Sequence, residues 1–556
     1  MKNTFYGIAV DIGTTTVAMS LMQWEKNSGN ASADGELTEN ADGRETGKKK
    51  NVGGHEAGER EEACEIFSVT FTNPQRKAAL GSDVLSRAKN AASDERVAER
   101  MRQLIRNQIA GYAKSFLERA GIKEDCPIII SGNTTMLHIF SGLPTGGLLR
   151  APFIPGDISL RHETIDFDES MLYEESVWKT GEPHDSGNAQ CEGGVRSGGR
   201  LRATVFPCIS AFVGGDIVAG IYALDLTEKK EPTMFIDLGT NGEMALAVNG
   251  RLYVTSVAAG PAFEGGNISI GMAAVEGAIS HVKIKSGFCR TDWLKSEDSH
   301  LQGRKNITAG ETEGGIRAGG SKGKAKTDQS AKGARYRPTN EVSCRPRGTI
   351  FTSQRWHPTG QDKSDTACGN RGEKTDIIGR TEKRSMDYPR GICGSGLFDA
   401  VAEMYLDGII DCHGTLSDRY IDEGFPIYIR DAGHRLLLKQ DDIRAFQTAK
   451  AAVCAGAMTL LRAAGADTKD VDEVLLAGSF GEYLDLHSAA TVGLLPGHLM
   501  EKARAVGNTS LAGAEKLLTH PEDEQQIVEI VNRCAQVSLA DDLYFKEAYI
   551  RNMDIW

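Results

Sequence analysis

Two segments of the chain place an aspartate at the end of an apolar run and follow it with a glycine–threonine turn. The first, residues 6–16, reads Tyr-Gly-Ile-Ala-Val-Asp-Ile-Gly-Thr-Thr-Thr, and the second, residues 235–243, reads Phe-Ile-Asp-Leu-Gly-Thr-Asn-Gly-Glu. A second apolar run follows each turn, which predicts two β-hairpins. Glycines let backbone N–H groups approach a phosphate closely, and an aspartate at a strand end can hold a metal ion. Either segment alone is equally well an ordinary hairpin.

A third glycine-rich segment, Val474–Gly481, follows a late apolar strand. The repeated hairpin indicates two halves of a duplicated core, with the two aspartates facing each other across a cleft. Two such hairpins followed by such a loop resemble the actin, sugar kinase and Hsp70 superfamily of ATP-binding proteins. The resemblance implies an α/β fold of two ribonuclease-H-like domains, residues 1–230 and 231–556, with mixed central sheets around a nucleotide cleft.

Composition limits the classes of function. The chain has 556 residues, 40% of them hydrophobic and 25% charged, which is enough for two or three soluble domains. The net charge of −12 argues against general nucleic-acid binding. No run approaches the roughly 18 apolar residues of a membrane span, and the N-terminus enters a strand without a signal-like segment. We therefore expect a cytoplasmic protein without a membrane or nucleic-acid partner.

The elements that position these motifs are strands and helices separated by polar insertions. Strands are expected at 66–71 and 127–131, and helices at about 82–120, 441–465, 509–518 and 523–534. Three stretches poor in large apolar residues, 25–62, 176–200 and 287–388, are expected to be disordered insertions. The last of these contains a basic part, residues 315–348, for which a tether to an acidic partner is the alternative interpretation.

One further turn has the composition of an anion site. The strand at 127–131 runs into Gly132, Asn133, Thr134 and Thr135, and a helix is expected to follow. Asparagine or threonine can cap that helix, and exposed N–H groups at a helix start suit an anion or a partner group. Plain capping explains the same residues. His138, in the same segment, is more simply a packed helix residue than a ligand.

These turns belong to longer motifs that are similar to the reductive activators of corrinoid proteins. The motifs are Gly132–Met136, Arg150–Phe153, Ala211–Asp216, Ala258–Gly266, Gly391–Leu397, Gln447–Ala452, Gly493–Pro496 and Val506–Thr509. Such activators use ATP to return an oxidised Co(II) corrinoid to its Co(I) state. The similarity covers the chain outside the polar insertions. It implies the same activity here, a corrinoid protein as partner and a homodimer.

The resemblances assign roles to particular residues. They imply that Asp11 and Asp237 hold Mg²⁺ through waters, and that Glu243 or Glu264 orders the attacking water. The residues expected to bind ATP are Gly13, Thr14, Thr15, Thr16, Gly239, Thr240, Asn241, Gly242, Gly394, Ser395, Gln447, Lys450, Gly478, Ser479, Phe480 and Gly481. For Gln447 and Lys450 a surface polar pair is the plain alternative. Cys393, beside Gly394, is more simply a small buried residue than a redox group.

The cysteine pattern departs from that of the family. Family activators commonly carry an iron–sulfur domain, but none of the eleven cysteines of this chain forms a C-x-x-C pair. We expect no intrinsic iron–sulfur cluster and a separate electron donor, such as a ferredoxin or a flavoprotein. Two alternatives stay open on the same core. One is a small-metabolite kinase, and the other is an ATP-dependent chaperone of a cobamide protein that moves no electrons.

Overall fold

Both predicted hairpins are present in the computed structural model. β1 (Lys2–Ile12) and β2 (Thr16–Asn27) are antiparallel, with Ile12 opposite Val17. β7 (Thr233–Leu238) and β8 (Gly242–Val248) are antiparallel, with Leu238 opposite Gly242. The structure describes residues 2–27, 63–78, 80–81, 83–123, 126–167, 199–294, 388–431, 433–478 and 484–555.

Each hairpin is the centre of a mixed sheet of six strands. The first sheet has the order β3-β2-β1-β4-β6-β5, where β4 and β6 run parallel to β1. The second has the order β16-β15-β7-β8-β9-β17, where β15 and β16 run parallel to β7. The added strands are β3 (Cys64–Thr72), β4 (Ile128–Gly132), β5 (Arg161–Phe167), β6 (Gly199–Val205), β9 (Arg251–Val257), β15 (Glu473–Ala477), β16 (Ala503–Gly507) and β17 (Cys534–Gln536). Five strands of each sheet therefore follow the same order, β3-β2-β1-β4-β6 in the first and β9-β8-β7-β15-β16 in the second.

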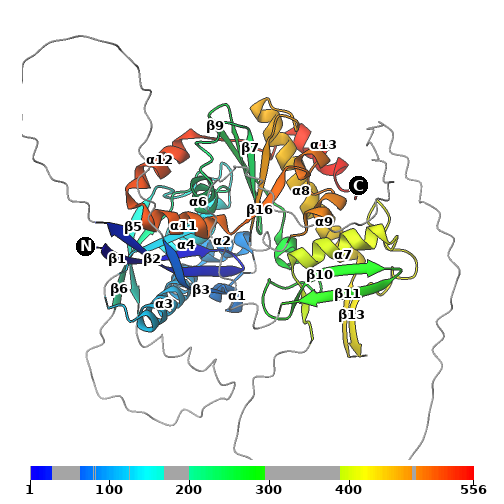
Figure 1. Cartoon of the computed structure of the whole chain (residues 1–556), viewed down its shortest axis with the longest axis horizontal. Coiled ribbons are helices and arrows are strands. Elements are labelled where there is room, and N and C mark those ends of the chain that lie inside the picture. The colour runs from blue at the N-terminus through cyan, green and yellow to red at the C-terminus, as the bar shows by residue number, and fades with distance from the viewer. Residues whose placement is uncertain are drawn as a thin grey trace, which may run out of the picture. The chain divides into compact units, whose positions relative to one another are not determined.

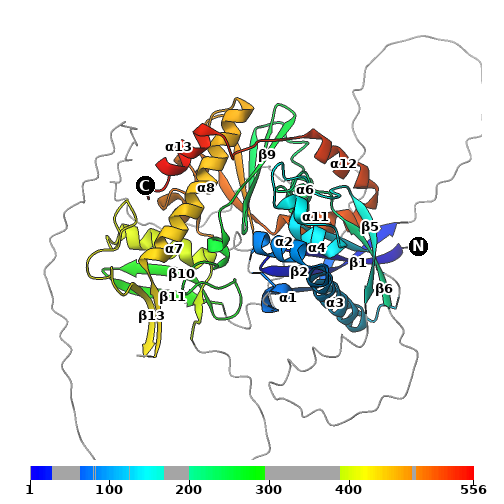
Figure 2. The same cartoon turned by 180° about the vertical axis from the view of Figure 1, so that it is seen from behind.

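Two helices far apart in sequence lie side by side between these sheets, α6 (Gly215–Ala223) and α11 (Thr509–Thr519) (Figures 1 and 2). Their apolar side chains share one buried cluster with residues of both sheets, among them Phe235 of β7. The helices touch closely, because a Cβ on Gly513 would lie 2.2 Å from the carbonyl oxygen of Ala219. Only glycine fits at this crossing.

Longer helices flank the two sheets. α3 (Glu95–Ala120) precedes β4, and α8 (Gln440–Ala464) precedes β15. A small sheet of β10 (Ala278–Lys285), β11 (Phe288–Trp293) and β12 (Gly391–Ile392) packs against α7 (Gly394–Leu406) beside the hairpin β13 (Phe425–Asp431) and β14 (His434–Leu438). The remaining α-helices are α1 (Pro74–Lys77), α2 (Val84–Ser93), α4 (Thr134–Ser141), α9 (Leu486–Thr491), α10 (Gly497–Met500), α12 (Glu524–Arg533) and α13 (Leu543–Arg551). In the part of the chain that the structure describes, no helix has the length and hydropathy to cross a membrane.

Several predicted boundaries are wrong. β2 continues to Asn27 and β11 occupies 288–293, so both strands extend into segments expected to be insertions, because pairing with β1 and β10 satisfies their polar backbones. β6 begins at Gly199 for the same reason, and the other residues of the three insertions lie outside the described ranges. The helix predicted over 82–120 is broken at Asp94, whose extended backbone and side chain cap α3. The helix α13 was not predicted.

Candidate functional site

The two Asp-x-Gly-Thr turns occupy equivalent places in the two sheets. In the strand pairing, Asp11 lies beside Ser131 of β4, and Asp237 lies beside Ala477 of β15. The glycine at the end of each neighbouring strand, Gly132 in β4 and Gly478 directly after β15, has positive φ, +151° and +121° respectively. A Cβ on Gly132 would lie 2.6 Å from the Ile12 carbonyl oxygen.

The equivalent Cβ on Gly478 would lie 2.5 Å from the Leu238 carbonyl oxygen. Both glycines therefore let the parallel neighbour of β1 or β7 come into direct contact with the residue that follows the aspartate.

The carboxylate of Asp11 is held by the start of α11. Asn508 donates from Nδ2 to Oδ2 of Asp11 at 2.9 Å, and Ser510 donates from Oγ to Oδ1 at 2.8 Å. Burial raises the pKa of Asp11, these two hydrogen bonds lower it, and the charge of Glu264 raises it again. The balance is a raised pKa.

Asp11 belongs to a cluster of carboxylates that includes a residue the sequence analysis did not select, Asp216 of α6. Burial raises the pKa of Asp216 to about 7, with a further contribution from Asp11. Burial also raises the pKa of Asp237 and Glu243 well above their usual range, and repulsion from Asp216 adds to both shifts. Carboxylates that repel one another in a half-buried site favour a cation between them.

These residues fit Mg²⁺, which prefers oxygen ligands and keeps several waters. Asp11 and Asp237 are the two that could hold it, with Asp216 close enough to interact electrostatically with both. Among the described residues, no group of three or more His, Cys, Asp or Glu side chains has the arrangement of direct metal ligands. That Asp11 and Asp237 hold Mg²⁺ through waters stays a prediction.

Glu264 connects the two Asp-x-Gly-Thr turns. Thr15 of the first turn donates to Oε2 of Glu264 at 2.5 Å, and Thr240 of the second donates to the same oxygen at 2.7 Å. Glu264 follows Phe263, which packs with Phe398 and Phe446 of α7 and α8. A carboxylate anchored in the core therefore binds the hydroxyls that we expected to donate to phosphate.

The first turn has a second brace that the sequence analysis missed. Asn73, directly after β3, is fully buried and donates from Nδ2 to the Gly13 carbonyl oxygen at 2.8 Å. Its backbone N–H donates to the Thr15 carbonyl oxygen at 2.9 Å. The segment Asn73-Pro74-Gln75 has the composition of an ordinary polar turn. Nothing in its local pattern indicates that it supports the turn between β1 and β2.

The Gly132–Thr135 turn is a helix start, as predicted. Asn133 accepts from the Met136 N–H to cap α4 and donates to Thr14 Oγ1 at 3.1 Å. Thr134 donates to the Ser210 carbonyl oxygen at 2.7 Å, and Thr135 is buried. His138 is a packed helix residue, as expected, and burial lowers its pKa. The Gly132–Thr135 turn thus supports the Asp-x-Gly-Thr turn that contains Thr14.

Other predicted ATP-binding residues contact protein groups in this structure. Ser395 is buried and donates to the Ser280 carbonyl oxygen, and its neighbour Cys393 is buried as expected. Gln447 donates to the carbonyl oxygens of His413 and Met553, so it is not a surface residue.

Lys450 donates to the carbonyl oxygen of Asp554, and burial lowers its pKa to about 8. Ser479, Phe480 and Gly481 lie outside the described residues. For Gly394, Ser395, Gln447 and Lys450, the nucleotide role stays a prediction.

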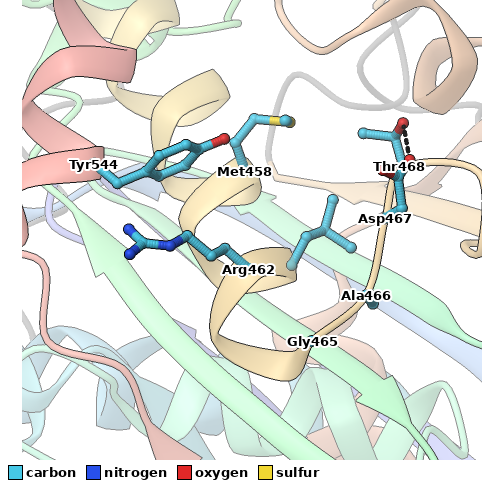
Figure 3. Close-up of a pocket in the computed structure, with 8 residues that line it drawn as sticks. Met458, Arg462, Gly465, Ala466, Asp467, Thr468 and Tyr544 are labelled. Atoms are coloured by element: carbon cyan, nitrogen blue, oxygen red, sulfur yellow. Dashed lines mark hydrogen bonds between the residues drawn. The ribbon is translucent and has the colours of Figure 1, made fainter.

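A pocket of about 420 Å³ lies where α8 ends, beside α13 (Figure 3). The guanidinium of Arg462 lies 4.9 Å from the centre of the Tyr544 ring, and Thr468 donates to Asp467 at 3.1 Å. None of the predicted site residues lines this pocket. The carboxylates and the two turns therefore remain the candidate site.

Comparison with known proteins agrees with this architecture. Residues 231–556, more than half of the chain, match the family model described as the C-terminal domain of RACo, the ASKHA domain. The chain belongs to the RACo family. Residues 60–172 match the RACo middle region. Membership of an ASKHA family implies a nucleotide-binding fold, so the resemblance to corrinoid activators and the two-sheet α/β prediction are confirmed.

Two relatives of this RACo-family chain have curated names. The corrinoid activation enzyme RamQ of Eubacterium limosum is 25% identical over 99% of this chain and 70% of RamQ. The [Co(II) methylated amine-specific corrinoid protein] reductase of Methanosarcina barkeri is 25% identical over 63% of this chain and 51% of the reductase.

A solved structure has the same fold. The reductive activator for corrinoid, iron-sulfur protein superposes with a TM-score of 0.63 at 23% identity, over 99% of this chain and 66% of the activator. The chain therefore spans between about half and 70% of the relatives it matches.

In this RACo-family chain, three residues at the carboxylate cluster were not selected from the sequence: Asp216, Asn508 and Ser510. Asp216 and Asn508 lie in motifs that had been recognised, Ala211–Asp216 and Val506–Thr509. The sequence signal for Asp216 was the pair Gly214-Gly215 directly before it. The structure explains the first of these glycines, because a Cβ on Gly214 would lie 2.6 Å from Cα of Asn133. For Ser510 no local signal existed.

Proposed function

We propose that this protein is an ATP-dependent reductive activator of a corrinoid protein. It would bind ATP between the two Asp-x-Gly-Thr turns and hydrolyse it to ADP and phosphate. The accompanying movement would allow one electron from a separate donor to convert Co(II) to Co(I) in the partner. The observation that carries the proposal is the pair of turns, each with an aspartate and a threonine hydroxyl, joined by Glu264.

The residues divide into metal holders and phosphate donors. Asp11 and Asp237 would hold Mg²⁺, which when bound supplies positive charge against the phosphate oxygens. The hydroxyls of Thr15 and Thr240 donate to Glu264 in this structure. They would have to break these hydrogen bonds before they could donate to phosphate, because each hydroxyl has one proton. The backbone N–H groups of both turns would add further hydrogen bonds.

A proton acceptor is needed for the attacking water. We assign this role to Asp216, because it lies in the first turn of α6, close enough to Asp11 and Asp237 to interact with both, and burial raises its pKa to about 7. Glu243 is buried, with a pKa raised well above its usual range, and Glu264 already accepts two hydroxyl hydrogen bonds. The sequence analysis predicts Glu243 or Glu264 as the residue that orders the attacking water. The rates of ATP hydrolysis of Asp216→Asn, Glu243→Gln and Glu264→Gln would separate the three candidates.

Coupling to the partner would run through closure of the site. Phosphates that displace Glu264 would shift Phe263, which packs between α7 and α8. Such a shift can move those helices relative to the hairpins. The electron donor is external in this proposal, because no two cysteines of the sequence form a C-x-x-C pair.

The test is anaerobic visible absorbance of a candidate corrinoid protein in its Co(II) state. This protein, Mg-ATP and a low-potential reductant would be added, with Asp237→Ala as the control. Nucleotide-dependent appearance of the Co(I) band, lost in the control, is the expected result. ATP consumption stimulated by the partner without Co(I) would favour a chaperone, and phosphorylation of an added hydroxyl compound would favour a kinase. Either outcome would overturn the proposal.

A further inference from the structure

We infer that Asn508 and Ser510 are positioning residues that hold the carboxylate of Asp11 in the orientation in which it binds Mg²⁺. The inference rests on the proposed function only in that Asp11 is taken as a metal holder. It assigns a task to the start of α11, which comes from the opposite end of the chain.

Each oxygen of the Asp11 carboxylate has its own donor. Asn508 donates to Oδ2 at 2.9 Å and Ser510 donates to Oδ1 at 2.8 Å, so the plane of the carboxylate is set by two contacts. Hydrogen bonds to a charged acceptor are stronger than neutral ones. Remaining lone pairs on both oxygens stay available for a metal or its waters.

The helix itself fixes which end of the Asn508 amide faces Asp11. Oδ1 of Asn508 accepts from the Leu511 N–H at 2.9 Å and thereby caps α11. The amide nitrogen must then point the other way, toward Asp11. The positive end of the helix dipole also lies at this carboxylate.

Ser510 is held from behind by the first sheet. Its Oγ lies 2.7 Å from Oγ of Ser131, which is paired with Asp11 across β1 and β4. Because the Ser510 proton is directed to Asp11, Ser131 is the donor in this contact. Ser131 also lies 3.1 Å from the Ser510 carbonyl oxygen. The hydroxyl of Ser510 is therefore constrained on both sides.

The position of α11 is fixed by its contact with α6. Gly513 lies too close to the Ala219 backbone for any side chain, so this contact fixes where α11 packs along α6. The same helix α6 carries Asp216 at its first turn. One helix pair thus places Asp216 directly and Asp11 through Asn508 and Ser510. Partners that orient a metal-holding carboxylate typically change metal affinity by roughly 10–100-fold when removed.

The experiment uses variants that separate orientation from helix capping. Asn508→Ser keeps a capping side chain but is too short to reach Asp11, so it removes one donor without changing the charge of the site. Ser510→Ala removes the other donor. Glu515→Gln, on the same helix and bonded to Ser20, is the matched control. Thermal melting of every variant checks that the fold is kept.

Two measurements are compared, binding of Mn²⁺ alone by electron paramagnetic resonance and the Mg²⁺ dependence of ATP hydrolysis. We expect Asn508→Ser and Ser510→Ala each to weaken both by roughly tenfold. The control should match the wild type. Unchanged metal affinity in Asn508→Ser and Ser510→Ala would overturn the inference.

The two measurements also separate this inference from the proposed function. If the wild type binds Mn²⁺ but hydrolyses no ATP, the proposed function fails, and the variants still decide the role of α11 through Mn²⁺ binding. If the wild type binds no metal in either measurement, both fail. A loss of ATP affinity with unchanged metal affinity would identify a purely structural helix start and would also overturn the inference.

Discussion

The two halves of the molecule present the same hairpin to the site but support it differently. In the first half, Asp11 receives hydrogen bonds from Asn508 and Ser510, and Asn73 braces its turn. In the second half, no described residue donates a hydrogen bond to the side chain of Asp237. Burial raises the pKa of Asp237 well above its usual range, and repulsion from three neighbouring carboxylates adds to the shift.

This difference teaches that a repeated strand order does not make repeated chemistry. The first hairpin holds a carboxylate that is fixed in place before any ligand arrives. The second presents one whose charge depends on a cation. We expect the site to have one oriented metal holder and one that becomes ordered with the metal.

The largest effect should come from removing either aspartate. Asp11→Asn and Asp237→Asn should each lower the rate of ATP hydrolysis by roughly 10³-fold, because the phosphate charge loses its metal holder. The rate would be measured by phosphate release at saturating Mg-ATP. A variant that retains most of its activity would show that only one half holds the metal.

The two strand-end glycines should respond alike. Gly132→Ala and Gly478→Ala should each lower the free energy of unfolding by about 2–4 kcal/mol, because a Cβ at these positions would lie about 2.5 Å from a carbonyl oxygen. Urea unfolding would measure this. Gly497→Ala is the control, since a Cβ there meets nothing within 4 Å. A loss confined to one glycine would break the equivalence of the halves.

The free energy of unfolding should change in opposite directions when Asp11 and Asp237 are replaced by asparagine. Asp11→Asn leaves Asn508 Nδ2 or Ser510 Oγ facing an amide and should cost about 1–2 kcal/mol of unfolding free energy. Asp237→Asn removes a repelled, poorly solvated charge and should stabilise the protein in the absence of metal. Denaturant unfolding in a chelating buffer at neutral pH tests this contrast. Equal destabilisation by both substitutions would contradict it.

The raised pKa values of Asp216, Asp237 and Glu243 predict an unusual pH dependence. The folded protein binds more protons than the unfolded chain between about pH 4 and 7, so the metal-free protein should become more stable as pH falls from about 8 to about 6. Mg²⁺ binds the ionised carboxylates, so the rise in Tm it produces should be larger at the higher pH.

Thermal melting with and without Mg²⁺ across this range tests the prediction. A metal-free Tm that falls on acidification, or a Mg²⁺ effect independent of pH, would contradict the clustering of these carboxylates in one site.

The smallest effect is expected at the residue that joins the halves. Glu264→Gln keeps an oxygen acceptor for Thr15 and Thr240 but removes the negative charge next to the incoming phosphates. We expect ADP to bind roughly three- to tenfold more tightly, as relief of one like-charge contact in a partly solvated site would give. Isothermal titration measures the affinity. Weaker binding would mean that Glu264 supports the nucleotide-bound site and does not compete with it.

Local patterns were enough to predict much of the fold and part of the site. The apolar runs around Asp11 and Asp237 predict both hairpins, and the strand before Gly132 with a capping Asn133 predicts a helix start. The stop at Gly465 marks the end of α8. Each of these depends on residues within a few positions of one another, where periodicity and capping act directly.

The boundaries failed where pairing with another strand decided the outcome. β11, Phe288–Trp293, contains charged and polar residues and has no strong strand pattern alone, but β10 supplies its hydrogen-bond partners. For Gln447 and Lys450, a surface polar pair was the plain alternative to a nucleotide-binding role, and the structure rules out a surface position. They are buried because the residues around Met553 and Asp554 return to cover them.

The sequence by itself determined that the chain carries two phosphate-sized turns with aspartates, a glycine-rich late loop and the motifs of corrinoid activators. Only the tertiary structure decided that Asn508 and Ser510 hold Asp11 and that Glu264 joins Thr15 to Thr240. Asn508 and Ser510 lie 497 and 499 positions from Asp11, and Thr15 lies 249 positions from Glu264. The physical cause of these contacts is the close packing of α11 on α6 between two sheets, and no short-range pattern encodes that distance.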